Sequence, residues 1–99
     1  MVRRRKSESV RTIKQRVGAG AIELTYHAVL EMIDEDISEE DIKTALRVGN
    51  LRERQKEEMG GAKYVLRGAG ADSRPIEVVC KLIQDSVRVI TVYRVESKK

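Results

Sequence analysis

The pattern of hydrophobic and polar residues divides the chain into a helical first half and a strand-forming second half. Residues 8–17 carry apolar side chains at the spacing of an amphipathic helix. Its apolar face holds Val10, Ile13 and Val17. We expect Ser7 or Ser9 to cap its start, and the glycines within residues 18–20 to end it.

Two further helix starts follow within residues 24–38. Thr25 is suited to an N-cap, with Leu24 and Val29 spaced as a hydrophobic staple. Ser38 repeats the arrangement, and Asp41 stands where a capping box places its acid. The residues expected to face the core are Ala28, Val29, Met32 and Ile33 in the first helix, and Ile42, Ala45 and Leu46 in the second. Gly49 is suited to end the second helix as a C′ residue.

From residue 50 onward the pattern changes to alternating and β-branched segments that predict strands. The expected strands are residues 51–57 (weak), 63–68, 76–83 and 87–95. Short turns between successive strands favour an antiparallel meander with the helices gathered on one face. The predicted class is therefore α+β, with N-terminal helices packed on one face of a small antiparallel sheet.

His27 is the single histidine of the chain and falls in the first turn of the helix that starts at Thr25. The first-turn N–H groups of a helix are unpaired and favour anions. The helix dipole should also favour the neutral form of this histidine. His27 is therefore a candidate for acid–base chemistry beside a phosphate, although a purely structural histidine is an equally simple interpretation.

Length and charge limit the remaining choices. The 99 residues suit one domain, which we place at residues 8–96 after a disordered basic tail at residues 1–7. The net charge of +4 is typical of a small domain that meets nucleic acid or an acidic partner. The single Cys80 fits a reducing, cytoplasmic location. We expect no secretory signal and no membrane span.

The strands carry many cations and two tyrosines, and helices cover only one side of so small a sheet. These residues are Lys63, Arg67, Arg74, Lys81, Arg88 and Arg94, with Tyr64 and Tyr93. A basic, tyrosine-bearing sheet face suits RNA, because bases stack on aromatic rings and cations meet phosphates. The alternative is that these are solvated strand positions of a basic protein.

The residues supplied exclude several kinds of chemistry. One histidine and one cysteine do not make the usual zinc clusters, and there is no phosphate loop or dinucleotide fingerprint. We therefore expect no metal and no cofactor. Catalysis, if present, must use histidine, tyrosine, lysine and arginine, a set that suits RNA cleavage by the 2′-hydroxyl group.

Three strings carry a resemblance to a known family. They are LTYHAVLEM at residues 24–32, DISEEDI at residues 36–42 and VRVITVYR at residues 87–94. With these strings the chain resembles the domain-of-unknown-function family 4258, which is grouped with the RelE, BrnT and MqsR type toxins. The string IKQRVGAG at residues 13–20 is also similar to the first helix of MqsR. The resemblance covers about residues 10–95.

The resemblance implies a RelE-like fold and a toxin-like mRNA endoribonuclease that an antitoxin protein neutralises. The resemblance assigns His27 and Arg94 to the active site, and we add Tyr93 as a stacking or proton-transfer group, so the expected catalytic residues are His27, Tyr93 and Arg94. Those that we expect to bind RNA are Lys56, Lys63, Arg67, Arg74 and Lys81. Glu35 stands where the family pattern has an arginine. A non-catalytic RNA- or protein-binding module with the same fold therefore remains the alternative.

Overall fold

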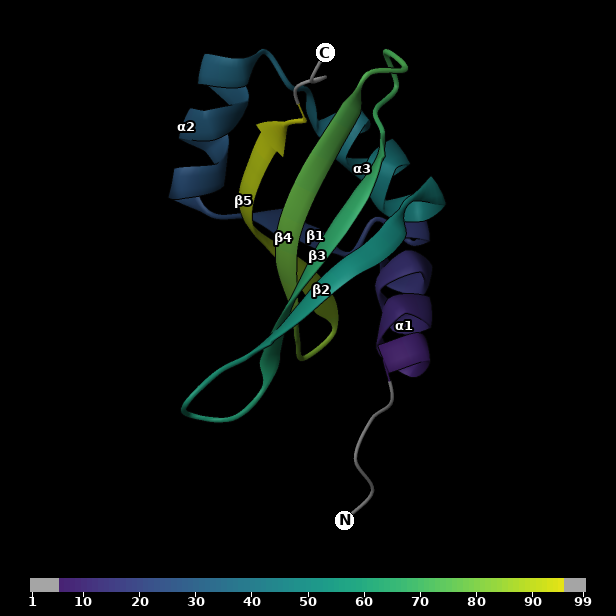
Figure 1. Ribbon diagram of the computed structural model, residues 1–99, viewed down its shortest axis with the longest axis vertical. Coiled ribbons are helices and arrows are strands. Elements are labelled where there is room, and N and C mark those ends of the chain that lie inside the picture. Colours follow the sequence, from purple (N-terminus) through teal and green to yellow (C-terminus); the bar gives the residue numbers. More distant parts are fainter. Residues whose placement is uncertain (1–5, 96–99) are drawn as a thin grey trace.

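A computed structural model describes residues 6–95. Within these residues lie three helices and five strands (Figure 1). The helices are α1 (Lys6–Gly18), α2 (Tyr26–Glu35) and α3 (Glu39–Val48). The strands are β1 (Ile22–Leu24), β2 (Asn50–Lys56), β3 (Ala62–Ala69), β4 (Pro75–Ile83) and β5 (Ser86–Arg94). The predicted α+β class is confirmed.

The start of α1 differs from its prediction. The helix begins at Lys6, so Lys6 and Ser7 of the predicted tail are helical, while residues 1–5 and residue 96 lie outside the described residues. Ser9 is no cap: it is fully buried, and its hydroxyl accepts a hydrogen bond of 2.9 Å from Tyr64. The placement of Tyr64 on an open basic face is therefore wrong, because its ring belongs to the core.

The sheet has the order β1-β5-β4-β3-β2. Strands β2 to β5 form the predicted antiparallel meander. Strand β1 pairs in parallel with β5, for example Ile22 opposite Val87, so the sheet is mixed. Its three residues are too few to show a periodic pattern in the sequence.

The core lies between the helices and one face of the sheet. Its fully buried side chains include Ile13, Ile42 and Leu46 from the helices, and Leu66, Ile76, Val78, Val87, Val89 and Val92 from the strands. Alternation along each strand then turns the intervening side chains to the opposite face. Figure 1 shows α3 behind the sheet and α2 beside β5, so the front of β3 and β4 is uncovered.

Helix α3 approaches β3 closely because two glycines lie between them. A Cβ atom on Gly49 would lie 2.4 Å from the Ala45 carbonyl oxygen and 2.6 Å from the Arg67 carbonyl oxygen. Gly68 leaves equally little room, at 2.5 Å from the Ala45 carbonyl oxygen. The φ of Gly49 is −76°, so it is not the left-handed C′ residue that we predicted. Space, not backbone conformation, requires glycine at this position.

The two predicted helix starts are confirmed. The Thr25 hydroxyl accepts a hydrogen bond from the Ala28 N–H at 3.1 Å. Ser38 and Asp41 form a complete capping box, with bonds of 3.0 and 2.9 Å. The prediction that Ile33 faces the core is wrong, because its side chain is 71% exposed. Local signals therefore located both helices but not the buried face of α2.

Helix α2 lies along the free edge of β5 and satisfies its backbone groups. Beyond β1, the N–H groups of Val92 and Arg94 point away from β4, and they donate to the carboxylates of Glu31 and Glu35 at 3.0 Å each. The Thr25 hydroxyl donates to the Ile90 carbonyl oxygen. The glutamates hold α2 beside the sheet and leave no open edge for another strand to pair with there.

Candidate functional site

Three side chains from adjacent strands meet at one end of the uncovered sheet face. Arg67 of β3 lies opposite Glu77 of β4, which lies opposite Tyr93 of β5. The Glu77 Oε2 atom accepts a hydrogen bond from Arg67 Nε at 2.8 Å and forms an ion pair with Arg67 Nη2 at 2.6 Å. The Tyr93 hydroxyl donates a short hydrogen bond to the other Glu77 oxygen. We call these three residues the central cluster.

The central cluster perturbs the titration of two of its members in opposite directions. Burial alone would raise the pKa of Glu77, but the hydrogen bonds from Tyr93 and Arg67 outweigh it and lower this pKa. The bond to Glu77, assisted by burial, raises the pKa of Tyr93. The positive charge of Arg52 also acts on Glu77. At neutral pH the cluster therefore holds an ionised carboxylate next to a fully protonated hydroxyl group.

The three side chains of the central cluster differ in their exposure to solvent. The Glu77 side chain is only 11% exposed, whereas Arg67 is 40% exposed. Tyr93 is 38% exposed and presents its ring on the open face. A ligand that lies across this face would therefore meet the tyrosine and the arginine first, with the carboxylate at the bottom between them.

A second polar row crosses the same face, four residues along β3, or about 13 Å, from the central cluster. Lys81 of β4 lies opposite Arg88 of β5, and Lys63 of β3 adjoins Lys81. We call these three the cation row. Like charges on neighbouring strands repel, and carboxylates relieve this at both ends. Glu57 contacts Lys81 at 2.7 Å and Lys63 at 3.9 Å, and Glu23 contacts Arg88 at 2.7 Å.

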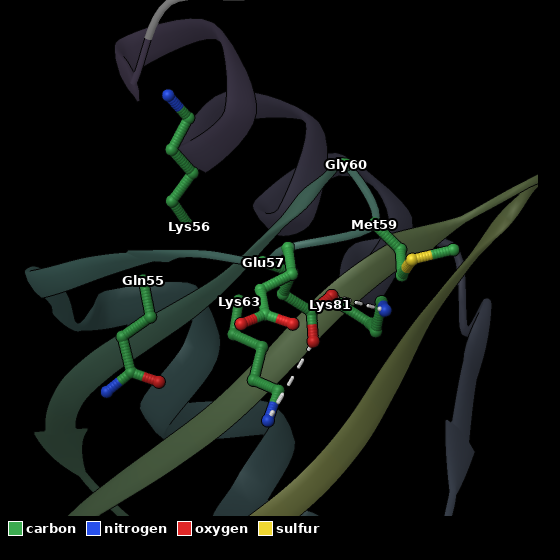
Figure 2. A pocket seen from close by; sticks show the side chains of 8 residues that line it. Gln55, Lys56, Glu57, Met59, Gly60, Lys63 and Lys81 are labelled. Atoms are coloured by element: carbon green, nitrogen blue, oxygen red, sulfur yellow. Dashed lines mark hydrogen bonds and ion pairs between the residues drawn. The ribbon is translucent and has the colours of Figure 1, made fainter.

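The end of the β2–β3 hairpin forms an open depression of about 650 Å³ beside the cation row. Figure 2 shows Glu57 turned toward Lys63 and Lys81, whereas Lys56 points away from them, toward the helix side. The hydrogen bond from Lys81 lowers the pKa of Glu57. This carboxylate therefore occupies the position where an anionic ligand would neutralise the two lysines.

His27 is placed apart from the central cluster. Its side chain is 64% exposed, and its Nε2 atom lies 3.4 Å from Glu31 in the next turn of α2. Within residues 6–95, no hydrogen bond or ion pair joins His27 to Tyr93 or Arg94. The structure thus does not bring the three predicted catalytic residues into direct contact.

Arg94 points to the opposite side of β5 from Tyr93. Its guanidinium donates to the carbonyl oxygens of Glu35 and Asp36, at 3.3 and 2.6 Å, and contacts Asp72 at 3.2 Å. These partners are the C-terminal end of α2 and the β3–β4 loop. The side chain is only 15% exposed. This geometry is that of a side chain that joins three segments of the fold.

The remaining predicted RNA-binding residues are divided between two places. Lys63, Arg67 and Lys81 lie on the open face, as the alternation predicted. Arg74 lies in the β3–β4 loop, where it pairs with Asp72 at 3.0 Å and is 61% exposed. With Lys56 on the helix side, the structure separates these two cations from the open face.

Sequence reasoning missed Glu77 as a site residue. The signal was present, because Glu77 is an acid within an otherwise apolar strand, with Ile76 and Val78 on either side. Only the register shows that it lies opposite both Arg67 and Tyr93. Cys80, in the same strand, is inert by comparison: burial raises the pKa of its thiol to about 12.

The described part of the chain lacks two kinds of feature. Among residues 6–95, no three side chains of the metal-ligating types are close enough to hold a metal ion. None of the helices in that range combines the length and the apolar character needed to cross a bilayer.

The model of one protein family matches residues 24–94, which is most of the chain. It is described as a domain of unknown function, DUF4258. The chain belongs to this family. The match begins at the last residue of β1 and ends at the last residue of β5, so it includes α2, α3, the central cluster and the cation row. Comparison with curated proteins and with solved structures returned no match.

Proposed function

We propose that this DUF4258 protein is a toxin-like, metal-independent mRNA endoribonuclease of a type II toxin–antitoxin pair. The observation that carries the proposal is the central cluster, in which a carboxylate, a hydroxyl and a guanidinium meet on an uncovered sheet face. These are the three kinds of group that metal-free RNA cleavage requires. The resemblance to the RelE, BrnT and MqsR toxins supports the choice of RNA as substrate.

The proposed reaction assigns one role to each member of the cluster. Glu77 takes the proton of a ribose 2′-hydroxyl group, and the 2′-oxygen forms a bond to the adjacent phosphorus. Tyr93 protonates the 5′-oxygen as the bond from phosphorus to this oxygen breaks. Arg67 stabilises the extra negative charge on the phosphorane. The products are a 2′,3′-cyclic phosphate and a free 5′-hydroxyl group.

The perturbed pKa values fix the protonation states from which these roles start, while making Glu77 a weaker base and Tyr93 a weaker acid than the free side chains. A lowered pKa keeps Glu77 ionised and able to accept a proton at neutral pH. A raised pKa keeps Tyr93 protonated and able to donate one. In this proposal Tyr93 keeps the catalytic role that the sequence indicated, Glu77 replaces His27 as the base, and Arg94 orders the fold around Tyr93.

The direct test is incubation of the pure protein with a long transcript in the presence of a chelator. We expect fragments that end in a 2′,3′-cyclic phosphate. Glu77→Gln and Tyr93→Phe should each lower the cleavage rate about 100-fold or more, a common effect of removing a general acid or base. Glu40→Gln, an exposed acid of α3, is the matched control and should cleave at the normal rate.

The His27→Ala variant distinguishes the two residues that have been assigned as the general base, His27 from the sequence and Glu77 from the structure. Normal cleavage by His27→Ala together with loss in Glu77→Gln supports the central cluster. Loss in His27→Ala with normal cleavage in Glu77→Gln would restore the sequence-based assignment. A transcript that stays intact with the unaltered protein, together with normal growth on overexpression, would refute the nuclease.

A non-catalytic RNA- or protein-binding module is the second candidate, and the ion pairs on the open face favour it over catalysis, because they leave little positive charge to stabilise a phosphorane. Arg67, Lys81 and Arg88 each contact a carboxylate at 2.7 Å or less, so their charges are already balanced. Such a module would bind RNA without product, with an affinity that falls steeply as salt rises. Filter binding of the transcript across a salt series distinguishes this outcome from cleavage.

A further inference from the structure

The outer side of α2 carries an exposed apolar stripe. Tyr26, Leu30 and Ile33 follow one another at i, i+4 and i+7, which places them on one side of the helix. They are 79%, 43% and 71% exposed. The other large exposed apolar residues of the described chain, Val48, Met59 and Tyr93, come from three separate elements or loops. A contiguous apolar patch of this kind is typical of an interaction site.

The fold holds this stripe outward. On the opposite side of α2, Ala28 is fully buried, and Glu31 and Glu35 bind the backbone of β5. A rotation of α2 that buried Ile33 would break both of these hydrogen bonds and expose Ala28. The stripe is therefore available in the folded protein and is not an unfilled part of the core.

The charges around the stripe are acidic. Of the four carboxylates of α2 and its C-cap, those of Glu31 and Glu35 face β5, which leaves the exposed Asp34 and Asp36 beside the stripe, against the single histidine, His27. Arg94 lies at the end of this helix, but its guanidinium is engaged by the Glu35 and Asp36 carbonyl oxygens and by Asp72. The stripe thus has an acidic border on a protein whose net charge is +4.

We propose that the α2 stripe is the docking site of a partner protein that presents a basic amphipathic helix. Apolar side chains at i, i+3 or i+4 and i+7 of the partner would pack on the stripe, as in other helix-mediated recognition. Its flanking lysines or arginines would face the acidic border. The surface is separate from the central cluster, so this inference stands whether or not the protein cleaves RNA.

Charge distinguishes this partner from two others. Phosphates of RNA would be repelled by the acidic border. A second copy of the chain would bring two acidic borders together.

Two helical peptides of about five turns test the proposal. Both carry leucine at the i, i+3, i+4 and i+7 positions, one with lysine and the other with glutamate at the remaining positions. We expect fluorescence anisotropy to show about threefold tighter binding of the lysine peptide, as two surface ion pairs would give. The net charge of the protein alone favours the opposite order, so this preference must come from α2.

Substitutions locate the binding on the stripe. Ile33→Lys should weaken the lysine peptide at least tenfold, because it adds both a steric and an electrostatic obstacle. Val48→Lys is the matched control, since Val48 is 62% exposed at the end of α3, and it should bind normally. Circular dichroism of both variants should match that of the unaltered protein.

Several results would overturn the proposal. They are equal binding of the two peptides, a preference for the glutamate peptide, and an Ile33→Lys variant that binds as tightly as the Val48→Lys variant. Sedimentation that shows a dimer at micromolar concentration, lost in Ile33→Lys, would identify a second copy as the occupant instead. Cleavage activity is not measured in these assays, so their failure is distinguishable from failure of the nuclease.

Discussion

Helices α2 and α3 have the same length and the same kind of start, yet they are used in opposite ways. Each has ten residues and a side-chain N-cap. Helix α3 buries Ile42, Ala45 and Leu46 against the sheet. Helix α2 is richer in apolar residues but fully buries only Ala28. The difference comes from position: α3 covers the middle of the sheet, whereas α2 lies along the β5 edge.

Position also decides what holds each helix. Helix α3 contacts β3 and β4 through apolar packing and the close approach at Gly49 and Gly68. Helix α2 is fastened by polar groups, with Glu31 and Glu35 on the β5 backbone and Arg94 on its last carbonyl oxygens. Apolar content therefore does not measure burial: the more hydrophobic helix is the one that keeps an exposed apolar side.

The largest expected difference in stability is between substitutions of two leucines, Leu46 of α3 and Leu30 of α2. Leu46→Ala, which empties a fully buried position of α3, should lower the free energy of unfolding by about 2–5 kcal/mol. Leu30→Ala on the stripe should lower it by less than about 1 kcal/mol, because much of that side chain already faces water. Urea unfolding of both variants measures the two values. Equal losses would contradict the contrast between the helices.

The next largest effect on stability concerns the polar contacts that hold α2 against β5. Arg94→Ala removes three charge-assisted contacts and should cost about 2–3 kcal/mol of unfolding free energy. Arg74→Ala, in the exposed loop beside it, should change stability by less than about 0.5 kcal/mol. Chemical denaturation with amide hydrogen exchange of α2 would show whether the loss is centred there. An Arg94→Ala variant as stable as Arg74→Ala would show that α2 does not depend on this residue.

A smaller effect concerns the start of α3 and its dependence on pH. Ser38→Ala should cost about 1 kcal/mol, as for other N-caps. The Ser38 N–H donates to Asp41 and lowers the pKa of that carboxyl below its ordinary value of 3.8. Because the folded pKa is the lower one, this contribution is complete above pH ~4 and is lost as the pH falls through the folded pKa.

The pH prediction is checked by unfolding the protein and Asp41→Asn between neutral pH and about pH 2.5. The unaltered protein should lose more stability on acidification than the variant does. Thr25→Ala, which removes an N-cap without a carboxyl group, should lower stability at all pH values without changing this slope. If the free energy of unfolding falls with pH in parallel for the protein and for Asp41→Asn, Asp41 is not the source of the acid sensitivity.

The smallest effect should come from the stripe itself. Ile33→Lys is expected to leave the free energy of unfolding within about 0.5 kcal/mol, because surface substitutions rarely do more. Ile42→Lys, at a fully buried position of α3, should prevent stable folding. Thermal melts of the two variants suffice. A marked loss of stability in Ile33→Lys would mean that the stripe contributes to the fold after all.

Much of the fold was predictable because its signals are local. The caps at Thr25 and Ser38 each depend on residues within four positions, and both were predicted correctly. The strands from β2 to β5 were likewise indicated by alternation and turn residues. Strand β1 was not, because three residues carry no period, and its pairing depends on a partner more than 60 residues away, Val87 opposite Ile22.

The candidate site was predictable only in part. Lys63, Arg67 and Lys81 were correctly expected on the open face, but the sequence did not show the carboxylates that neutralise them. Tyr93 and Arg94 were grouped because they are adjacent in sequence. Neighbouring residues of a strand point to opposite faces. Tyr93 therefore lies in the central cluster, whereas Arg94 contacts the C-terminal end of α2.

By itself, the sequence determined the α+β class, the two capped helices and the family, because these depend on local order and short motifs. Only the tertiary structure decided which side of α2 is buried and which acid meets Tyr93. Both outcomes depend on sheet register and on where an element lies relative to the sheet edge. Those contacts join Glu77 with Tyr93 and Glu31 with Val92, residues that no local pattern brings together.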